Sequence, residues 1–160
     1  MPQQCNDSSE YRFLTSPSSN LECRLVSSAN GPELQIFGNR AGLLSLANIL
    51  LWLLANAWRR EFLSLGELEF IRLEGQLSVC IRLTDEDAIG THGLVRRLDH
   101  DSLLEWVISE DELKAVALLI HGLVSGPCHE YDRLLTGEES VCAIHIRMTD
   151  VADWLKKGIF

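Results

Sequence analysis

The chain has 160 residues, of which 46% are hydrophobic and 23% are charged, a composition typical of a folded globular domain. Its 14 basic and 23 acidic residues give a formal net charge of -9, which repels phosphate backbones and anionic membrane surfaces. We therefore expect neither nucleic acid nor a membrane as partner, and we predict one domain over residues 11–160 preceded by a disordered polar segment over residues 1–10.

The cysteines indicate a reducing compartment. They are odd in number and widely spaced, and most lie in apolar, strand-like runs, a pattern typical of reduced and buried thiols. They are Cys5, Cys23, Cys80, Cys128 and Cys142. The first seven residues have neither the basic start nor the apolar stretch of a secretory signal. We predict a cytoplasmic protein.

The first third of the chain reads as strands followed by a helix. Residues 11–14 and 21–26 alternate in polarity and are separated by the turn-forming residues 16–19, which predicts a hairpin. Residues 34–37 have the period of a strand, and Asn39 is placed to cap a helix.

That helix is unusually apolar. From Ala41 to Trp58 there are 18 residues without a charge, the length at which a membrane span becomes arguable. Asn48 and Asn56 make the segment a poor span, and a helix that is apolar on nearly every face is also typical of a protein core. We predict a central core helix.

The middle of the chain predicts a second hairpin. Residues 67–73 and 76–83 have strand character and are separated by Glu74-Gly75, a two-residue turn signal. Residues 84–108 are hard to assign, apart from an expected strand at 105–108.

The last third predicts a second long helix. Ser109-Glu110-Asp111-Glu112 is a capping box, and apolar residues recur at helical spacing from Leu113 to Val124. A strand is expected over 141–147, and Thr149-Asp150 would open a short helix. The predicted fold class is α+β: an antiparallel or mixed β-sheet packed against two longer helices and a short C-terminal helix.

Reactive side chains are densest around Cys128 and His129, which could approach His121 and His145 in the fold. Such a group suits a metal site or a thiol nucleophile with a nearby base. Paired ligand spacings such as Cys-x-x-Cys are absent from the sequence, so a surface loop is the favoured interpretation and no metal or cofactor is expected. A small metal- or thiol-dependent hydrolase centred on Cys128, His129 and His145 remains the alternative.

Two further features have a functional and a structural interpretation. Gly38 and Gly42, between a strand and a helix, suggest anion binding at the helix start with help from Arg40, but the glycine fingerprints of nucleotide sites are missing. Trp58 lies in the apolar segment and is expected in the core. Trp106 lies near acidic residues, where an interface anchor and core packing are both open, with the core favoured.

Acidic residues recur in short groups along the chain. If two or more groups converge on one face, they create a negative patch that steers and holds a basic protein. The residues that we expect to form such a partner-binding surface are Asp85, Glu86, Asp87, Asp99, Asp101, Trp106 and Glu110.

The run from Glu33 to Ala47, continuing to Leu50-Leu51, contains a strand, a Gly-Asn turn and a helix that starts Gly-Leu-Leu-x-Leu-Ala. It resembles the opening of small bacterial immunity proteins from polymorphic-toxin systems. The resemblance implies a cytoplasmic protein that binds a cognate toxin and blocks it without catalysis. This is our leading hypothesis; beside the hydrolase, a structural subunit of a larger assembly is a third hypothesis, because the apolar helix is so long.

Overall fold

The computed structural model describes residues 14–29, 31–58, 60–85, 93–98, 103–125, 132–135 and 141–149. In chain order the elements are β1 (Leu21–Ser28), β2 (Gly31–Gly38), α1 (Arg40–Ala55), β3 (Phe62–Ser64), the 3-10 helix η3 (Leu65–Glu67), β4 (Ile71–Leu73), β5 (Ser78–Thr84), β6 (Leu94–Leu98), β7 (Leu103–Ser109), α2 (Glu110–Ser125), β8 (Asp132–Leu135) and β9 (Ala143–Met148). The predicted α+β class is confirmed.

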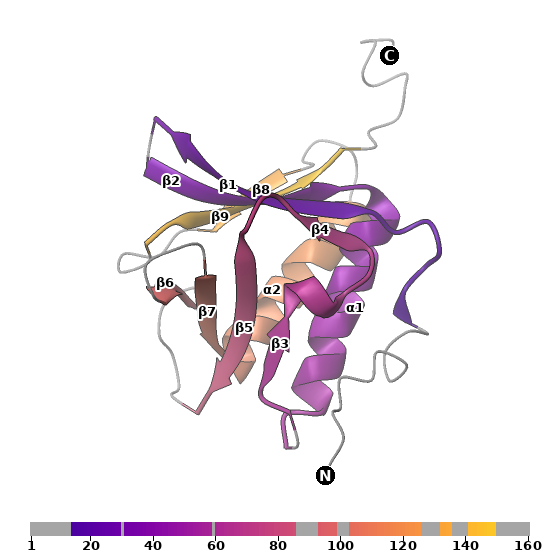
Figure 1. Cartoon of the computed structure of the whole chain (residues 1–160). Helices are drawn as coiled ribbons and strands as arrows, with labels where there is room; N and C mark the ends of the chain where they lie inside the picture. Colours follow the sequence, from indigo (N-terminus) through magenta and orange to yellow (C-terminus); the bar gives the residue numbers. More distant parts are fainter. Residues whose placement is uncertain are drawn as a thin grey trace.

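The strands form two sheets. Sheet A has the order β4-β1-β2-β9-β8 and sheet B the order β3-β5-β7-β6. Both are mixed: in sheet A, β2 is antiparallel to β1 and parallel to β9, and in sheet B, β7 is parallel to β5 and antiparallel to β6. Sheet A lies across the top of Figure 1, sheet B descends below it, and the two helices run side by side opposite sheet B.

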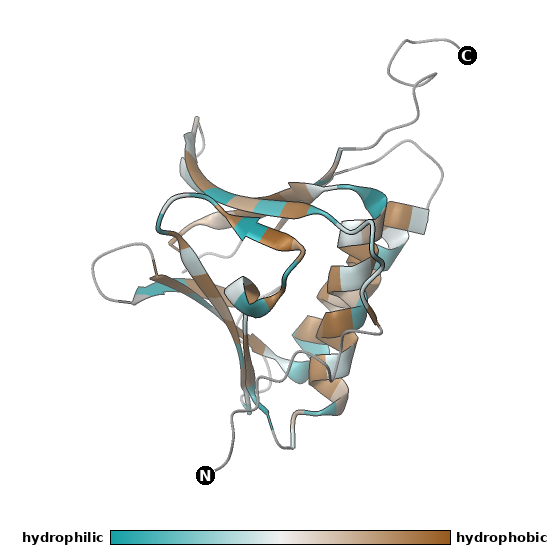
Figure 2. Cartoon of the chain, turned by 45° about the vertical axis from the view of Figure 1, so that its right-hand side comes forward, coloured by the Kyte–Doolittle hydropathy of each residue, from teal (hydrophilic) through white to brown (hydrophobic). Residues whose placement is uncertain are grey.

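A single hydrophobic core joins the sheets and the helices. Strand residues alternate between faces, and the inward set includes Leu34 and Ile36 of β2 and Ile81 of β5, all buried. α1 contributes Leu46 and Leu50 among its buried residues. Hydrophobic residues dominate both helices in Figure 2, whereas along the strands they alternate with hydrophilic ones.

The two helices are antiparallel. A guanidinium nitrogen of Arg40, at the start of α1, donates to the carbonyl oxygen of Val124, near the end of α2. Nearer the middle, the Nε2 atom of His121 lies 3.2 Å from the Oδ1 atom of Asn48. The end of α1 therefore lies beside the start of α2.

Helix α1 matches the predicted core helix but is shorter. Asn39 caps it as expected, since its side-chain oxygen accepts a 2.7 Å hydrogen bond from the Gly42 amide. The helix ends at Ala55, so Trp58 lies beyond it and not in its buried stripe. No helix among the described residues has the length and apolar character needed to cross a membrane.

The first predicted hairpin is wrong in its pairing. Leu21–Ser28 is a strand, but its antiparallel partner is β2, with Ser28 opposite Gly31. Gly31 has a φ of 110°, a conformation that glycine adopts freely and that suits a tight turn. Residues 11–13 of the predicted first strand lie outside the described residues.

The second predicted hairpin is also wrong. β4 pairs in parallel with β1 in sheet A, whereas β5 pairs with β3 and β7 in sheet B. Gly75, with a φ of 64°, turns the chain from one sheet into the other. The turn signal therefore marked a real change of direction but not a pair of strands.

The end of the chain is confirmed where it is described. The capping box is present: the Glu112 amide donates to the Ser109 hydroxyl at 3.2 Å, and the Ser109 amide donates to the Glu112 carboxylate at 3.0 Å. Strand β7 contains the expected strand at 105–108. The expected C-terminal helix and the segment 1–10 lie outside the described residues.

Candidate functional site

Two of the predicted acidic residues meet at one end of sheet B. Strands β5 and β7 run in parallel, and their last residues, Thr84 and Ser109, are paired. The residues that follow, Asp85 and Glu110, therefore lie side by side at the same end of the sheet. Both are exposed, and so is Asp111.

Strand β3 and the residue before it place two more side chains at this end of sheet B. The Leu83 amide donates a 2.8 Å hydrogen bond to the carbonyl oxygen of Glu61, and Phe62 is paired with Arg82. Glu61 is exposed, and Phe62 retains 45% of its surface. A carboxylate and a phenyl ring thus lie beside the end of β5.

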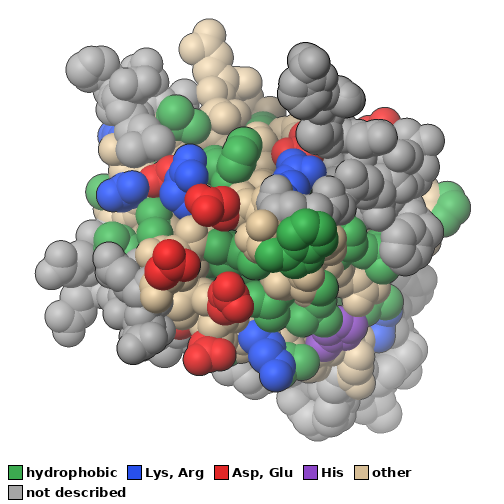
Figure 3. All heavy atoms as spheres, turned by 90° about the horizontal axis from the view of Figure 1, so that it is seen from below, with side chains coloured by type: hydrophobic (Ala, Val, Ile, Leu, Met, Phe, Trp, Pro, Cys, Tyr) green, Lys and Arg blue, Asp and Glu red, His purple; other side chains and the backbone are tan. Residues whose placement is uncertain are grey.

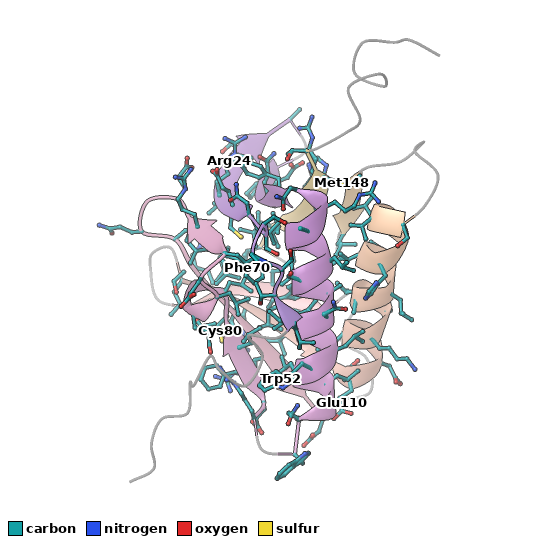
Figure 4. The ribbon with its side chains drawn as sticks, turned by 90° about the vertical axis from the view of Figure 1, so that its right-hand side faces the viewer. Arg24, Trp52, Phe70, Cys80, Glu110 and Met148 are labelled. Carbon is teal, nitrogen blue, oxygen red and sulfur yellow. The ribbon has the colours of Figure 1, made fainter. Side chains whose placement is uncertain are left out.

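Helix α1 delivers an aromatic side chain to the same end. Trp58, three residues beyond the last residue of α1, is 81% exposed. Because α1 ends where α2 begins, Trp58 lies at the end of the molecule that carries Glu110. In Figure 4, Glu110 lies at the opposite end from Met148 and Arg24.

We call this region the acidic end surface; it consists of Trp58, Glu61, Phe62, Asp85, Glu110 and Asp111. Figure 3 looks onto this end of the molecule and shows acidic side chains gathered beside hydrophobic ones. Solvated carboxylates next to exposed aromatic rings are a combination suited to binding another protein.

The basic residues near this surface are largely neutralised by partners of their own. Arg60 pairs with Glu67 at 2.5 Å and lies 5.8 Å from the ring centre of Trp52. Arg82 pairs with Glu105 at 2.7 Å. Lys114, one turn into α2, is exposed. Arg82 shares the carboxylate of Glu105 with Arg96, so one of these two positive charges is not balanced. Four carboxylates of the surface therefore face this one charge and Lys114, which still leaves this end negative among the described residues.

The ion pairs behind the surface centre on Glu105. This carboxylate accepts hydrogen bonds from Arg82 at 2.7 Å and from Arg96 at 2.8 Å, and only 3% of the residue is exposed. Burial raises the pKa of Glu105, but the hydrogen bonds and positive charges of Arg82 and Arg96 outweigh it, so the pKa is below its ordinary value.

This cluster also positions an aromatic residue of the surface. The guanidinium group of Arg82 lies 5.5 Å from the ring centre of Phe62, a cation–π contact. Glu105 holds Arg82, and Arg82 in turn covers one face of the ring. The cluster thus supports the acidic end surface without contributing to its exposed area.

The structure brings only part of the predicted surface together. Asp85 and Glu110 belong to it, whereas Glu86, Asp87, Asp99 and Asp101 lie outside the described residues. The prediction that Trp106 belongs to the partner-binding surface is wrong. Its side chain faces the core between sheet and helices and is 2% exposed, so it cannot anchor a partner on this surface.

Sequence reasoning missed Trp58, Glu61 and Phe62. Trp58 was expected in the core because the uncharged run extends to it, yet the helix stops earlier. The signal was Asn56, which caps the end of α1: its amide and its side-chain nitrogen both donate to the carbonyl oxygen of Trp52.

The alternative centre around Cys128 and His129 lies outside the described residues. His145 is on the face of β9 opposite the buried Ile144 and Ile146, where its Nδ1 atom lies 3.5 Å from the carboxylate of Glu33. His121 bonds instead to α1. Within the described ranges, no group of three or more His, Cys, Asp or Glu side chains could hold a metal ion.

The described cysteines are free thiols: Cys23, Cys80 and Cys142. Burial raises the pKa of Cys23 to about 12, and it also raises that of Cys142. Cys80 is half-buried, and burial again raises its pKa. All three are protonated at neutral pH, and the thiolate is the reactive form.

Gly38 and Gly42 have a structural explanation. A Cβ atom on Gly38 would lie 2.0 Å from the Asn20 carbonyl oxygen, and one on Gly42 would lie 2.8 Å from the same atom. The Asn39 side chain occupies the helix start, where it accepts from the Gly42 and Asn20 amides. The glycines let the start of β1 pack against the start of α1, which explains both glycines without a bound anion.

Comparison of the chain with protein-family models, curated proteins and solved structures finds no match.

Proposed function

We propose that this protein binds a basic bacterial toxin through the acidic end surface and neutralises it without catalysis, in the cytoplasm of the cell that makes both. The observation that carries the proposal is the convergence of Asp85 and Glu110, from strand ends 25 residues apart, beside the exposed rings of Trp58 and Phe62.

The segment that resembles immunity proteins supports the proposal through its local structure. Residues 33–51 form the body of β2, the Asn39 cap and the first three turns of α1, which is the strand-turn-helix on which the likeness to polymorphic-toxin immunity proteins rests. Free thiols at Cys23, Cys80 and Cys142 are compatible with a reducing compartment.

The physical mechanism is occlusion assisted by charge. Carboxylates on an exposed end attract a positively charged patch over about one Debye length and raise the rate of association. Trp58 and Phe62 then supply the apolar contact that holds the complex, since aromatic residues near the centre of an interface carry much of its binding energy. A toxin whose active cleft is basic would be covered by this end.

Co-expression tests the proposal. The product of the neighbouring reading frame, as the candidate toxin, is produced with the chain in a sensitive strain, and growth rescue and recovery of the complex are measured. A surface variant carries Glu61→Gln and Asp85→Asn. Its matched control carries Glu69→Gln and Glu74→Gln, two exposed acidic residues that flank β4 on the other side of the fold.

We expect rescue and complex formation with the native chain and with the control, and at least tenfold weaker binding with the surface variant. Equal binding by the surface variant and the control would count against the acidic end surface. Absence of both complex and rescue with the native chain would count against neutralisation itself.

A further inference from the structure

Sheet B has an outer face, on the side away from helices α1 and α2 (Figure 1). Strand residues alternate between the two faces of a sheet, and Ile81 of β5 and Trp106 of β7 point into the core. Their neighbours Arg82 and Glu105 therefore lie on the outer face. Arg96 of β6 is paired with Glu105 in the strand register and lies on this face too. The outer face thus carries a carboxylate with an arginine on either side.

Glu105 orients both guanidinium groups. The Nε atom of Arg82 donates to its Oε2 atom at 2.7 Å, and the Nε atom of Arg96 donates to its Oε1 atom at 2.8 Å. The carboxylate is buried, whereas the side chains of both arginines are partly exposed. Because one buried group holds both arginines, their positions are fixed before any partner arrives.

The cluster carries one positive charge in excess. Two guanidinium groups share the carboxylate of Glu105, and no ion pair joins either of them to another described residue. The hydrogen bond to Glu105 does most to raise the pKa of Arg82, and the charge of Glu61 contributes least. By contrast, Arg72 and Glu22 form a one-to-one pair at 2.9 Å on sheet A. The two arginines on sheet B therefore retain a charge and N–H donors for a further anion.

We propose that Arg82 and Arg96 form a binding site for one carboxylate group of the toxin; this inference rests on the proposed function. Guanidinium groups bind planar oxyanions through paired N–H groups. A phosphate group carries about two negative charges, and Glu61 and Asp85 at this end of sheet B, with the net charge of -9, oppose it. A singly charged carboxylate balances the one excess positive charge.

The site borders the acidic end surface. Phe62 belongs to that surface, and its ring centre lies 5.5 Å from the guanidinium group of Arg82. The strands follow in the order β3-β5-β7-β6, so Arg96 lies three strand spacings from Phe62, about 14 Å across the sheet. A typical interface buries about 800 Å² per partner and is therefore about 30 Å across. A toxin that covers Phe62 also reaches Arg96.

A positive site beside four carboxylates gives this region a pattern of both signs. A uniformly basic partner would place a cation against Arg82 and Arg96, and the repulsion would weaken its binding. A partner with a carboxylate at this position forms an ion pair there instead. Arg82 and Arg96 therefore determine specificity, because they select the cognate toxin from other basic proteins.

Titration of the isolated chain with sodium acetate tests the site without the toxin. NMR follows the Nε–H signals of the arginine side chains, with sodium chloride at equal ionic strength as the reference. The signals of Arg82 and Arg96 should shift and saturate, with a half-point below about 100 mM. The signal of Arg72, which has a carboxylate of its own, should not. Arg96→Gln should abolish the shift of Arg82, because it removes the excess charge.

Binding to the toxin tests the source of the carboxylate. The product of the neighbouring reading frame, as the candidate toxin, is titrated with the native chain, Arg96→Gln and the matched control Arg72→Gln, and circular dichroism confirms that each is folded. Arg96→Gln should weaken the complex about tenfold and Arg72→Gln less than about twofold. Net charge alone predicts the opposite for Arg96→Gln, because this variant is more negative and attracts a basic toxin more strongly.

Three results would overturn the proposal. They are the absence of a saturable acetate shift at both arginines, tighter binding of phosphate than of acetate, and a toxin complex that Arg96→Gln leaves as tight as the native one. Toxin binding without acetate binding would leave the proposed function standing. Acetate binding by a chain that binds no toxin would overturn the proposed function and the toxin as the source of the carboxylate.

Discussion

Replacing Glu105 with glutamine should lower the free energy of unfolding by about 1–2 kcal/mol at pH 7. The native carboxylate accepts two charge-assisted hydrogen bonds, from Arg82 and Arg96, and each such bond contributes about 1.5–3 kcal/mol when fully buried. The side chains of the two arginines are 41% and 54% exposed, so water screens both pairs. The expected loss for the two bonds together is therefore only about 1–2 kcal/mol.

The loss should depend on pH in a defined direction. The pKa of Glu105 is lower in the folded protein than its ordinary value. Its stabilising contribution is therefore fully present above the unfolded pKa and is lost as the pH falls through the folded pKa. The difference between native protein and variant should be largest near neutrality and should shrink in acid.

Urea denaturation of both proteins near pH 7 and near pH 3 measures this difference. Glu74→Gln serves as the control, since Glu74 is exposed and its replacement should change stability by less than about 0.5 kcal/mol. A difference that stays constant or grows in acid would refute the role given to the two arginine pairs.

Other residues give predictions that need only the purified chain. Ser109→Ala should cost about 1 kcal/mol in urea denaturation, because it removes the hydroxyl of the capping box. Gly38→Ala should cost about 2–3 kcal/mol, since its Cβ atom would meet backbone, whereas Gly122→Ala, with nothing near its Cβ, should stabilise α2 by about 0.5–1 kcal/mol. Cys23, with a pKa of about 12, should resist alkylation until the protein is unfolded, as mass spectrometry of its peptide would show. Trp58→Ala should change stability by less than about 0.5 kcal/mol and lower the tryptophan fluorescence that acrylamide quenches, because that indole is exposed.

The helices could be predicted because their signals are local. Asn39 and the box from Ser109 to Glu112 act on amides three residues away, and the apolar positions of α2 repeat within the helix itself. Such interactions do not depend on where the rest of the chain lies.

The strand partners could not be predicted because pairing is decided by contacts distant in sequence. Gly75 is compatible both with a hairpin and with a change of sheet. Packing against the core decides between them: β4 places Ile71 opposite Leu21 of β1, and β5 places Ile81 opposite Trp106 of β7. None of these partners lies next to the turn.

The candidate surface was predictable only in part for the same reason. Asp85 and Glu110 were recognised as acidic residues, but their meeting depends on the parallel register that pairs Thr84 with Ser109. Trp58, which was expected in the core, is exposed, whereas Trp106, for which both the core and the surface were considered, is buried. The indole of Trp106 points inward from a central strand of sheet B, and α1 ends before it reaches Trp58.

The central claim is that the acidic end surface binds a basic toxin. Calorimetric titration of the chain with the product of the neighbouring reading frame, as the candidate toxin, at salt concentrations of about 50 mM and about 200 mM, tests it most directly. We predict a one-to-one complex that weakens with salt and loses at least tenfold in affinity in the Trp58→Ala variant. A complex that neither salt nor Trp58→Ala weakens, or no binding of the native chain, would contradict the claim.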